Sequence, residues 1–197
     1  LLVFQGYTKL RSTNDYLPGT AFSGISFLPP AAGFELYGNR IQLTGGLTNL
    51  QPWVVQTIAT PLQLSGPLEI HVIEGGTLNL TGVISGGNVR LEKTGGGVLT
   101  LGAANGFDGP VQVRDGLVAV ASDAALGVAP VGFDPGRLVL DRGGLRATAS
   151  MVLSAQRGIR LGPANSVGWG RMEVVSGATL QYAGTIANQG NEGGLVK

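Results

Sequence analysis

The side chains most suited to acid–base or metal chemistry are five aspartates in the middle of the chain. Asp108, Asp115, Asp123, Asp134 and Asp141 follow one another at intervals of seven to eleven residues. Paired carboxylates can cleave glycosidic bonds, and stacked carboxylates can hold calcium. Asp115 could stack on Asp134, and Asp123 on Asp141, if the chain repeats about every 20 residues. The Gly-Gly-x-Gly-x-Asp repeat of calcium-binding solenoids is absent, so we predict turn residues and no metal site.

The other reactive side chains lack the partners that catalysis needs. His71 is the sole histidine and lies in the alternating run 68–73, which predicts a solvent-facing strand residue. There is no cysteine and no Gly-x-Ser-x-Gly sequence, and Lys93-Thr-Gly-Gly-Gly97 lacks the residue order of a phosphate-binding loop. We therefore predict no catalytic residues, no cofactor and no enzymatic activity.

Two tryptophans are the candidate ligand contacts. Trp53 and Trp169 lie in residues 49–57 and 162–171, the longest departures from strand patterning, and functional contacts are often grafted on loops. Arginines are enriched in the second half of the chain, and a mildly basic face there could contact acidic surface glycans. Outward arginines that cover apolar surface explain the same enrichment. These arginines are Arg137, Arg142, Arg146, Arg157, Arg160 and Arg171.

Composition limits the class of protein that can present these residues. The 197 residues include 34 glycines, 43% are apolar and 13% are charged, with a net charge of +1. The even spread of aliphatic residues predicts one packed domain over residues 1–197. The near-neutral charge argues against a nucleic-acid partner, and no run approaches the roughly 18 to 20 apolar residues of a transmembrane segment.

Short alternating runs predict an all-β fold. Apolar residues alternate with polar ones over three to six residues, and glycine, asparagine, proline or serine separates the runs. Residues 121–126 offer room for one helical turn at most. The runs are residues 41–43, 62–64, 68–73, 77–80, 89–91, 98–101, 111–113, 117–120, 138–140, 159–161, 172–175 and 179–182.

Internal repetition favours a solenoid over a sandwich, barrel or propeller. Residues 77–84 resemble residues 179–186 at an offset of 102, and Lys93 and Lys197 stand 104 apart. A coil of about 20 residues makes this period about five coils and the whole chain about ten. Glycine and asparagine (Asn39, Asn49, Asn88 and Asn105) are expected at the corners, where tight turns need positive φ.

Residues 91–120 resemble the autotransporter-associated β-strand repeat of autotransporter passenger β-helices. They match most of the pattern L-x-K-x-G-x-G-x-L-x-L-x-G-x-N-x-[YF]-x-G, in which Ala103 stands in place of a glycine. Pro110 and Val118 are small departures further along the repeat. Similar flanking runs extend the resemblance over residues 20–197. It implies a right-handed parallel β-helix with Phe107 pointing inward. It also implies an excerpt of a longer passenger region, extracellular or at the Gram-negative cell surface in association with the outer membrane.

These observations predict a non-catalytic structural or adhesive β-helical module. A stiff rod with open ends could self-associate into a homo-oligomer, a fibre or a layer through its ends or faces. One alternative is a carbohydrate-active β-helix that binds glycans or cleaves polysaccharides, which needs several charged side chains converging on one outer face. Another is a calcium-stiffened stalk.

Overall fold

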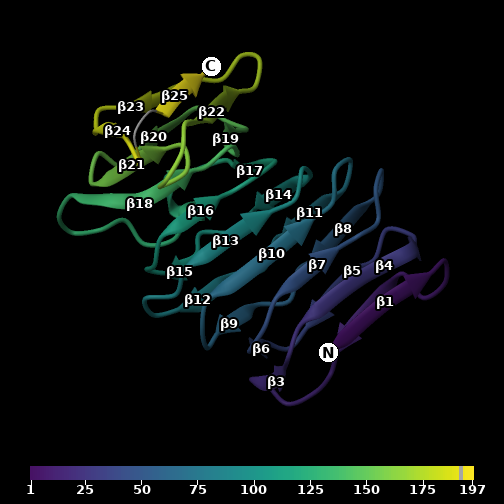
Figure 1. Cartoon of the computed structure of the whole chain (residues 1–197). Helices are drawn as coiled ribbons and strands as arrows, with labels where there is room; N and C mark the ends of the chain where they lie inside the picture. Colours follow the sequence, from purple (N-terminus) through teal and green to yellow (C-terminus); the bar gives the residue numbers. More distant parts are fainter. Residues whose placement is uncertain (191–192) are drawn as a thin grey trace.

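The chain forms a parallel β-helix in a computed structural model that describes residues 1–190 and 193–197. Successive strands turn around a common axis, and each coil lies on the one before it, from the N-terminus at one end to the C-terminus at the other (Figure 1). Every strand pairing among the described residues is parallel. The all-β fold predicted from alternation and the solenoid favoured by internal repetition are confirmed.

Two long sheets form two faces of the helix, and each contains nine strands. Sheet A contains β1 (Leu2–Gly6), β4 (Ile25–Ala31), β7 (Leu47–Asn49), β10 (Leu68–Val72), β13 (Leu91–Thr94), β16 (Val111–Val113), β18 (Asp134–Leu140), β21 (Arg157–Leu161) and β24 (Ile186–Asn188). Sheet B contains β2 (Arg11–Asn14), β5 (Glu35–Gly38), β8 (Val55–Ile58), β11 (Thr77–Leu80), β14 (Val98–Leu101), β17 (Leu117–Val120), β19 (Gly144–Ala147), β22 (Gly168–Val174) and β25 (Gly193–Val196).

The third face is interrupted. Sheet C contains β3 (Thr20–Phe22), β6 (Ile41–Leu43), β9 (Leu62–Leu64), β12 (Ile84–Gly86) and β15 (Gly106–Phe107). A single 3-10 turn, η1 (Asp123–Leu126), then takes the place of a strand. The face resumes with the pair β20 (Met151–Leu153) and β23 (Leu180–Tyr182). The one turn predicted for residues 121–126 is confirmed.

The described residues form eight complete coils and the start of a ninth, which corrects the expectation of about ten. Coil 1 is β1 to β3, each later coil begins with the next strand of sheet A, and the ninth begins with β24. Coil length varies: Val111 lies 20 residues after its partner Leu91, but Leu138 lies 27 residues after Val111. At about 4.8 Å per coil, the rod is roughly 40 Å long.

The 102-residue offset also needs correction, because it aligns strands of different faces. Leu78 lies in β11 of sheet B, whereas Leu180 lies in β23 of the third face. The similarity therefore reflects a strand pattern common to all faces of the solenoid. The offset between the two segments therefore cannot be used to find the number of coils.

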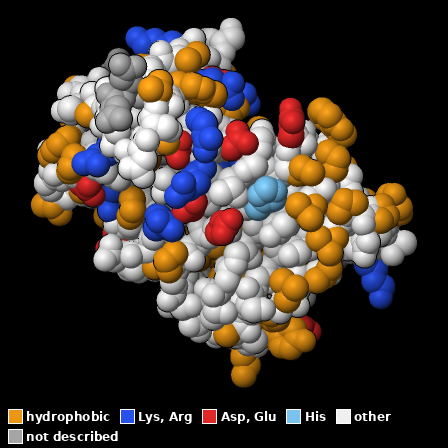
Figure 2. Space-filling view, viewed as in Figure 1, with side chains coloured by type: hydrophobic (Ala, Val, Ile, Leu, Met, Phe, Trp, Pro, Cys, Tyr) orange, Lys and Arg blue, Asp and Glu red, His pale blue; other side chains and the backbone are white. Residues whose placement is uncertain are grey.

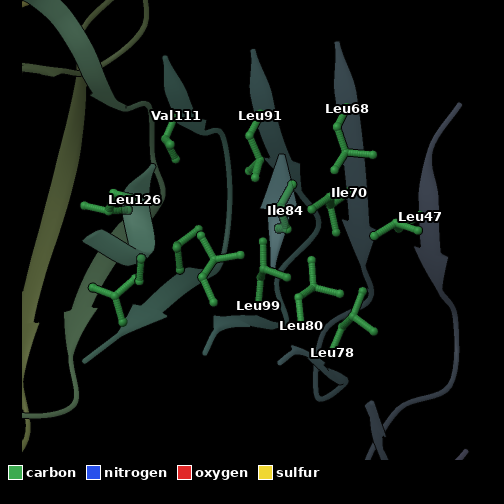
Figure 3. Packing of buried hydrophobic residues seen from close by; sticks show 14 of the residues in the cluster. Leu47, Leu68, Ile70, Leu78, Leu80, Ile84, Leu91, Leu99, Val111 and Leu126 are labelled. Carbon is green, nitrogen blue, oxygen red and sulfur yellow. The ribbon is translucent and has the colours of Figure 1, made fainter. Parts of the chain in front are cut away.

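Aliphatic side chains fill the interior in stacked rows. Leu68, Leu91 and Val111 point inward from successive strands of sheet A toward Leu78 and Leu99 of sheet B (Figure 3). Full burial of each such side chain contributes about 1.5 to 3 kcal/mol. A single coil has no second layer against which to bury them, so stability depends on stacking. Phe107 is also fully buried, as the repeat resemblance implied.

Buried amide side chains connect neighbouring coils. Asn105 accepts from the Ile84 backbone N–H of the preceding coil (2.8 Å) and donates to the Ala125 carbonyl of the next (2.7 Å). Asn49 is likewise buried and donates to the Thr77 carbonyl (3.1 Å). Of the four asparagines expected to provide positive-φ corners, only Asn88 has a positive φ, 43°. Asn49 and Asn105 instead satisfy backbone groups inside the helix.

Two glycines lie where adjacent coils approach too closely for a side chain. A Cβ on Gly45 would lie 2.0 Å from the Ser23 carbonyl oxygen, and one on Gly109 would lie 2.0 Å from the Val89 carbonyl oxygen. Both distances are far inside van der Waals contact. Glycine therefore sets the spacing of the coils at these two points.

Candidate ligand-binding surface

The corner between sheets A and B carries one residue with left-handed backbone in each of coils 3 to 8. Four of these residues are glycines, which adopt positive φ without steric strain. The other two are Trp53 (φ 61°) and Arg142 (φ 65°). A bulky residue in this region is disfavoured and is often retained for its side chain. The four glycines are Gly75, Gly95, Gly116 and Gly162.

Trp53 lies in a turn, as predicted, and projects from the corner of coil 3. It is 85% exposed. Its ring lies over the next coil, because a Cβ on Gly75 would be 3.1 Å from three ring atoms. Its backbone N–H donates to the Gly75 carbonyl (2.9 Å). Trp53 therefore covers a glycine and lines none of the cavities described below.

Lys93 is turned into this corner, which sequence reasoning missed. The side chain is fully buried, and its ammonium donates to the carbonyls of Thr94 (2.8 Å), Gly95 and Asp115 (3.3 Å). Burial lowers the pKa of Lys93 to about 8, and the negative charge of Asp115 partly opposes that shift. The Lys93 side chain thus joins the corner of coil 5 to that of coil 6.

A ladder of opposite charges runs outside sheet A next to the corner. Arg114 contacts the Glu92 carboxylate of the previous coil, and its Nη1 lies 3.7 Å from Asp141 Oδ2 of the next. Arg142 Nε lies 3.6 Å from Asp141 Oδ1, and Arg90 pairs with Glu92 at 3.0 Å. Figure 2 shows basic and acidic side chains mixed in this region, near the single histidine. The arginine side chains are 43 to 62% exposed, whereas those of Glu92 and Asp141 are only 15% and 5% exposed.

Two adjoining cavities open beside this ladder and share Arg114 and Arg142. The larger has a volume of about 500 Å³, and most of its lining residues are polar. The smaller, about 350 Å³, adds Asp115 and Trp169. We call the two together the corner groove. The larger cavity is lined by Gln112, Arg114, Asp141, Arg142, Pro163, Ala164, Asn165, Ser166 and Gln189.

Trp169 belongs to a strand, which corrects its placement in an irregular stretch. It lies in β22 and is 42% exposed. Its carbonyl accepts from the Arg142 backbone N–H (2.7 Å), which places the tryptophan beside the corner of the preceding coil. Trp53 lies in coil 3 and Trp169 in coil 8, so about 24 Å of stacked strands separates them. The structure does not bring the two candidate residues together.

The expected stacking of aspartates is wrong. Asp115 lies in an A–B corner, whereas Asp134 begins β18 on sheet A. Asp123 lies in η1 on the third face, whereas Asp141 follows β18 at an A–B corner. The 27-residue coil between Val111 and Leu138 shifts each pair out of register. Among the described residues, no three His, Cys, Asp or Glu side chains gather to hold a metal.

Asp123 instead pairs with a buried arginine. Arg157 is 1% exposed, and its Nε donates to Asp123 Oδ1 (2.8 Å) while Nη2 donates to Oδ2 (3.2 Å). The guanidinium also donates to the carbonyls of Asp123, Leu126 and Gly127. The same Oδ1 accepts from the Ser154 backbone N–H (3.0 Å). This cluster fills the face where η1 interrupts the strands.

The arginines of the second half do not form one basic face. Arg137 and Arg157 are buried, and burial, followed by the charge of Arg157, lowers the pKa of Arg137. Arg146 and Arg171 share the carboxylate of Glu173 on sheet B, at 2.7 and 3.0 Å. Of these six arginines, only Arg142 lines the corner groove described above.

His71 lies outward in β10, as predicted, and is half-buried. Its Nδ1 lies 3.1 Å from Thr94 Oγ1 on the neighbouring strand β13. This contact connects two coils across the outer surface of sheet A. It gives His71 a structural partner on the next strand.

The fold and its outer surface define the class, a parallel β-solenoid with a polar groove along one corner. The chain is similar to part of an autotransporter adhesin, BmaC, of Brucella suis biovar 1 (strain 1330), with 31% identity over 132 residues. The alignment covers 64% of this chain and 4% of that adhesin. No family model matches the chain, and no solved structure matches it significantly. The resemblance to autotransporter passenger β-helices predicted from residues 91–120 is confirmed by this similarity together with the stacked coils.

No helix in the part of the chain that the structure describes has the length and apolar character needed to cross a bilayer.

Proposed function

We propose that this chain is a non-catalytic structural and adhesive module of a surface-displayed or secreted autotransporter-like protein. The observation that carries the proposal is a stack of coils joined by two continuous sheets, similar to part of an autotransporter adhesin, with an outer groove lined mainly by polar residues. Solenoids of this kind present extended surfaces to partners. The location at the outer surface of a Gram-negative cell is part of the proposal.

The absence of catalysis is inferred from how the carboxylates are used. Asp123 is bonded to Arg157, Asp115 Oδ1 accepts from the Gly116 backbone N–H (2.7 Å), and Asp141 lies between Arg114 and Arg142. Glycoside cleavage needs two carboxyl groups facing each other across a substrate. The corner groove is lined by Asp141, which is held between two cations, and by Asp115, which is bonded to a backbone N–H, so neither carboxylate is free to act as one of such a pair.

Beads coated with the purified chain test adhesion. We expect them to stay on cultured epithelial cells under flow several-fold more often than albumin-coated beads. Retention equal to that of albumin would refute the adhesive role. Release of reducing ends from a polysaccharide panel, faster than with heat-inactivated chain, would refute the non-catalytic assignment.

We further propose that the module self-associates end to end. Among the described residues of sheet A, β1 and β24 each have one paired neighbour, and Phe4 and Tyr182 near the two ends of the core are only partly buried. Unpaired strand edges pair readily with other strands, and lysine on an edge discourages that pairing. Sedimentation velocity should therefore show species larger than the monomer that disappear in Val3→Lys, at an exposed position of β1. A monomer at every concentration would contradict this.

A further inference from the structure

The corner groove has the size of a small-ligand site. Its two cavities, about 500 and 350 Å³, fall within the roughly 300 to 1,000 Å³ typical of such sites. Hydrogen-bonding side chains dominate the lining of the larger cavity: two arginines, an aspartate, two glutamines, an asparagine and a serine. A ligand there would be held by hydrogen bonds to many polar groups.

Two buried acceptors in the groove wall have no hydrogen-bond donor among the described residues. They are Asp141 Oδ1 and Gln189 Oε1. The Asp141 side chain is 5% exposed, and the nearest cations, Arg142 Nε at 3.6 Å and Arg114 Nη1 at 3.7 Å, lie beyond hydrogen-bonding distance. Buried polar atoms are nearly always bonded, so each exception needs an explanation. A ligand that supplies hydroxyl donors provides one.

Arg142 lies over Asp141 with a strained backbone. Its φ of 65° is that of the glycines at four neighbouring corners, and its side chain is 62% exposed. Such strain at a non-glycine residue amounts to about 1 kcal/mol or more and is concentrated at functional sites. Because its end is in solvent, the guanidinium can swing away from Asp141 and leave the carboxylate open to the groove.

Trp169 forms an apolar wall of the smaller cavity beside Arg142. The hydrogen bond between the Arg142 N–H and the Trp169 carbonyl (2.7 Å) holds the two backbones together. Indole presents a large flat face with partial negative charge. The C–H face of a sugar ring is flat, apolar and slightly positive, and complements that surface.

The charges around the groove are balanced, which favours a neutral ligand. Three arginines face three carboxylates: Arg90, Arg114 and Arg142 against Glu92, Asp115 and Asp141. A phosphate or carboxylate would meet repulsion as well as attraction. Hydroxyl groups both donate and accept, so they match alternating carboxylate, amide and guanidinium groups.

We propose that the corner groove binds a neutral saccharide, with Trp169 stacking on a sugar ring and Asp141 and Arg142 hydrogen-bonding its hydroxyls. This inference rests on the proposed adhesive function and names the ligand class of that surface. The groove binds without cleaving. Trp53, five coils away, has no part in it.

An array of immobilised oligosaccharides tests this with the whole chain. The probes are neutral oligomers of glucose, galactose, mannose and N-acetylglucosamine, with uronic-acid oligomers as the charged comparison. We expect binding to at least one neutral probe that changes little between 0.15 and 0.5 M NaCl, because screening affects mainly ionic contacts. Trp169→Ala and Asp141→Asn should lower the affinity at least tenfold, and Trp53→Ala should leave it unchanged.

Arg142→Gly separates binding from folding. Glycine relieves the positive φ, so this variant should melt at the same temperature as wild type or higher while binding falls at least tenfold. Failure to bind any neutral probe, binding only to uronic acids or to a protein partner, or full binding by Trp169→Ala would overturn the proposal. Bead adhesion that persists in Trp169→Ala would refute the saccharide site and leave the adhesive function standing.

Discussion

Arg157→Met is expected to lower the free energy of unfolding by about 3 to 5 kcal/mol, since removing one partner of a buried ion pair has effects of this size. The guanidinium is 1% exposed and donates to both Asp123 oxygens and to three backbone carbonyls. Methionine fills most of the volume but leaves those acceptors without their donors. Urea unfolding followed by circular dichroism measures the difference.

The effect is large because of where the cluster lies. Arg157 begins coil 8, and Asp123 lies in the turn that ends coil 6, so one side chain reaches past coil 7. A solenoid is stabilised mainly by contacts between adjacent repeats. The missing strand pairing at η1 weakens those contacts on the third face, and Arg157 compensates for it.

A neighbouring arginine supplies the control. Arg160 lies on the same strand and makes one exposed bond, from Nε to the Pro135 carbonyl (3.0 Å). Arg160→Met should change the unfolding free energy by less than about 1 kcal/mol. In the double variant Arg157→Met with Asp123→Ala, the free energy of unfolding should fall by less than the sum of the decreases in the two single variants, because no unpaired charge remains. Equal losses for Arg157→Met and Arg160→Met would contradict the argument.

The fold could be predicted from the sequence because solenoid strands carry a local signal. Most strands alternate, and the interior positions are mainly aliphatic, as at Leu78 and Leu80 of β11. The number of coils could not be predicted, because turn insertions vary the coil length, which ranges from 20 to 27 residues along sheet A. Alternation indicates which side chains point inward. It does not indicate to which face a strand belongs.

The sequence places Trp169 in an irregular stretch because glycine occurs in this fold both in turns and at close contacts between coils. Gly168 and Gly170 resemble turn residues, but both lie in β22. A Cβ on Gly170 would lie 2.6 Å from Leu140 Cβ and 2.7 Å from Leu161 Cδ2, so glycine is needed where the interior is already full. Composition alone does not distinguish this close packing from a turn.

The burial of two cationic side chains could not be predicted from the sequence for a different reason. Lysine and arginine are almost never fully buried, so Lys93 and Arg157 are expected at the surface unless their partners are known. Lys93 donates to two carbonyls of its own corner and to one of the next coil, and Arg157 donates to an aspartate and three carbonyls two coils away. Carbonyl positions depend on the completed stack. The corner groove could not be predicted either, because Arg114, Arg142 and Trp169 come from three different coils.

Lys93→Met is expected to lower the free energy of unfolding by about 1 to 3 kcal/mol at pH 7, because buried carbonyls lose their donor. The carbonyls are those of Thr94, Gly95 and Asp115, and the ammonium that bonds to all three joins the corners of coils 5 and 6. Methionine retains the apolar stem and removes the ammonium. Lys9→Met, at an exposed position, is the matched control and should change the unfolding free energy by less than about 0.5 kcal/mol.

The pH dependence of the same pair of proteins tests the burial of the charge. The pKa of Lys93 falls from 10.5 to about 8 in the folded chain because burial disfavours the ammonium. Between these values the unfolded chain binds more protons than the folded one, so wild type gains stability as pH rises, by at most about 1.4 kcal/mol per unit. Burial raises the pKa of Tyr182 and acts in the opposite sense near and above its ordinary value of 10.0, so the useful range is pH 8 to 9.5. In that range the stability of wild type relative to Lys93→Met should increase with pH. A difference that stays flat or shrinks would mean that the ammonium is solvated and that Lys93 does not join the corners as described.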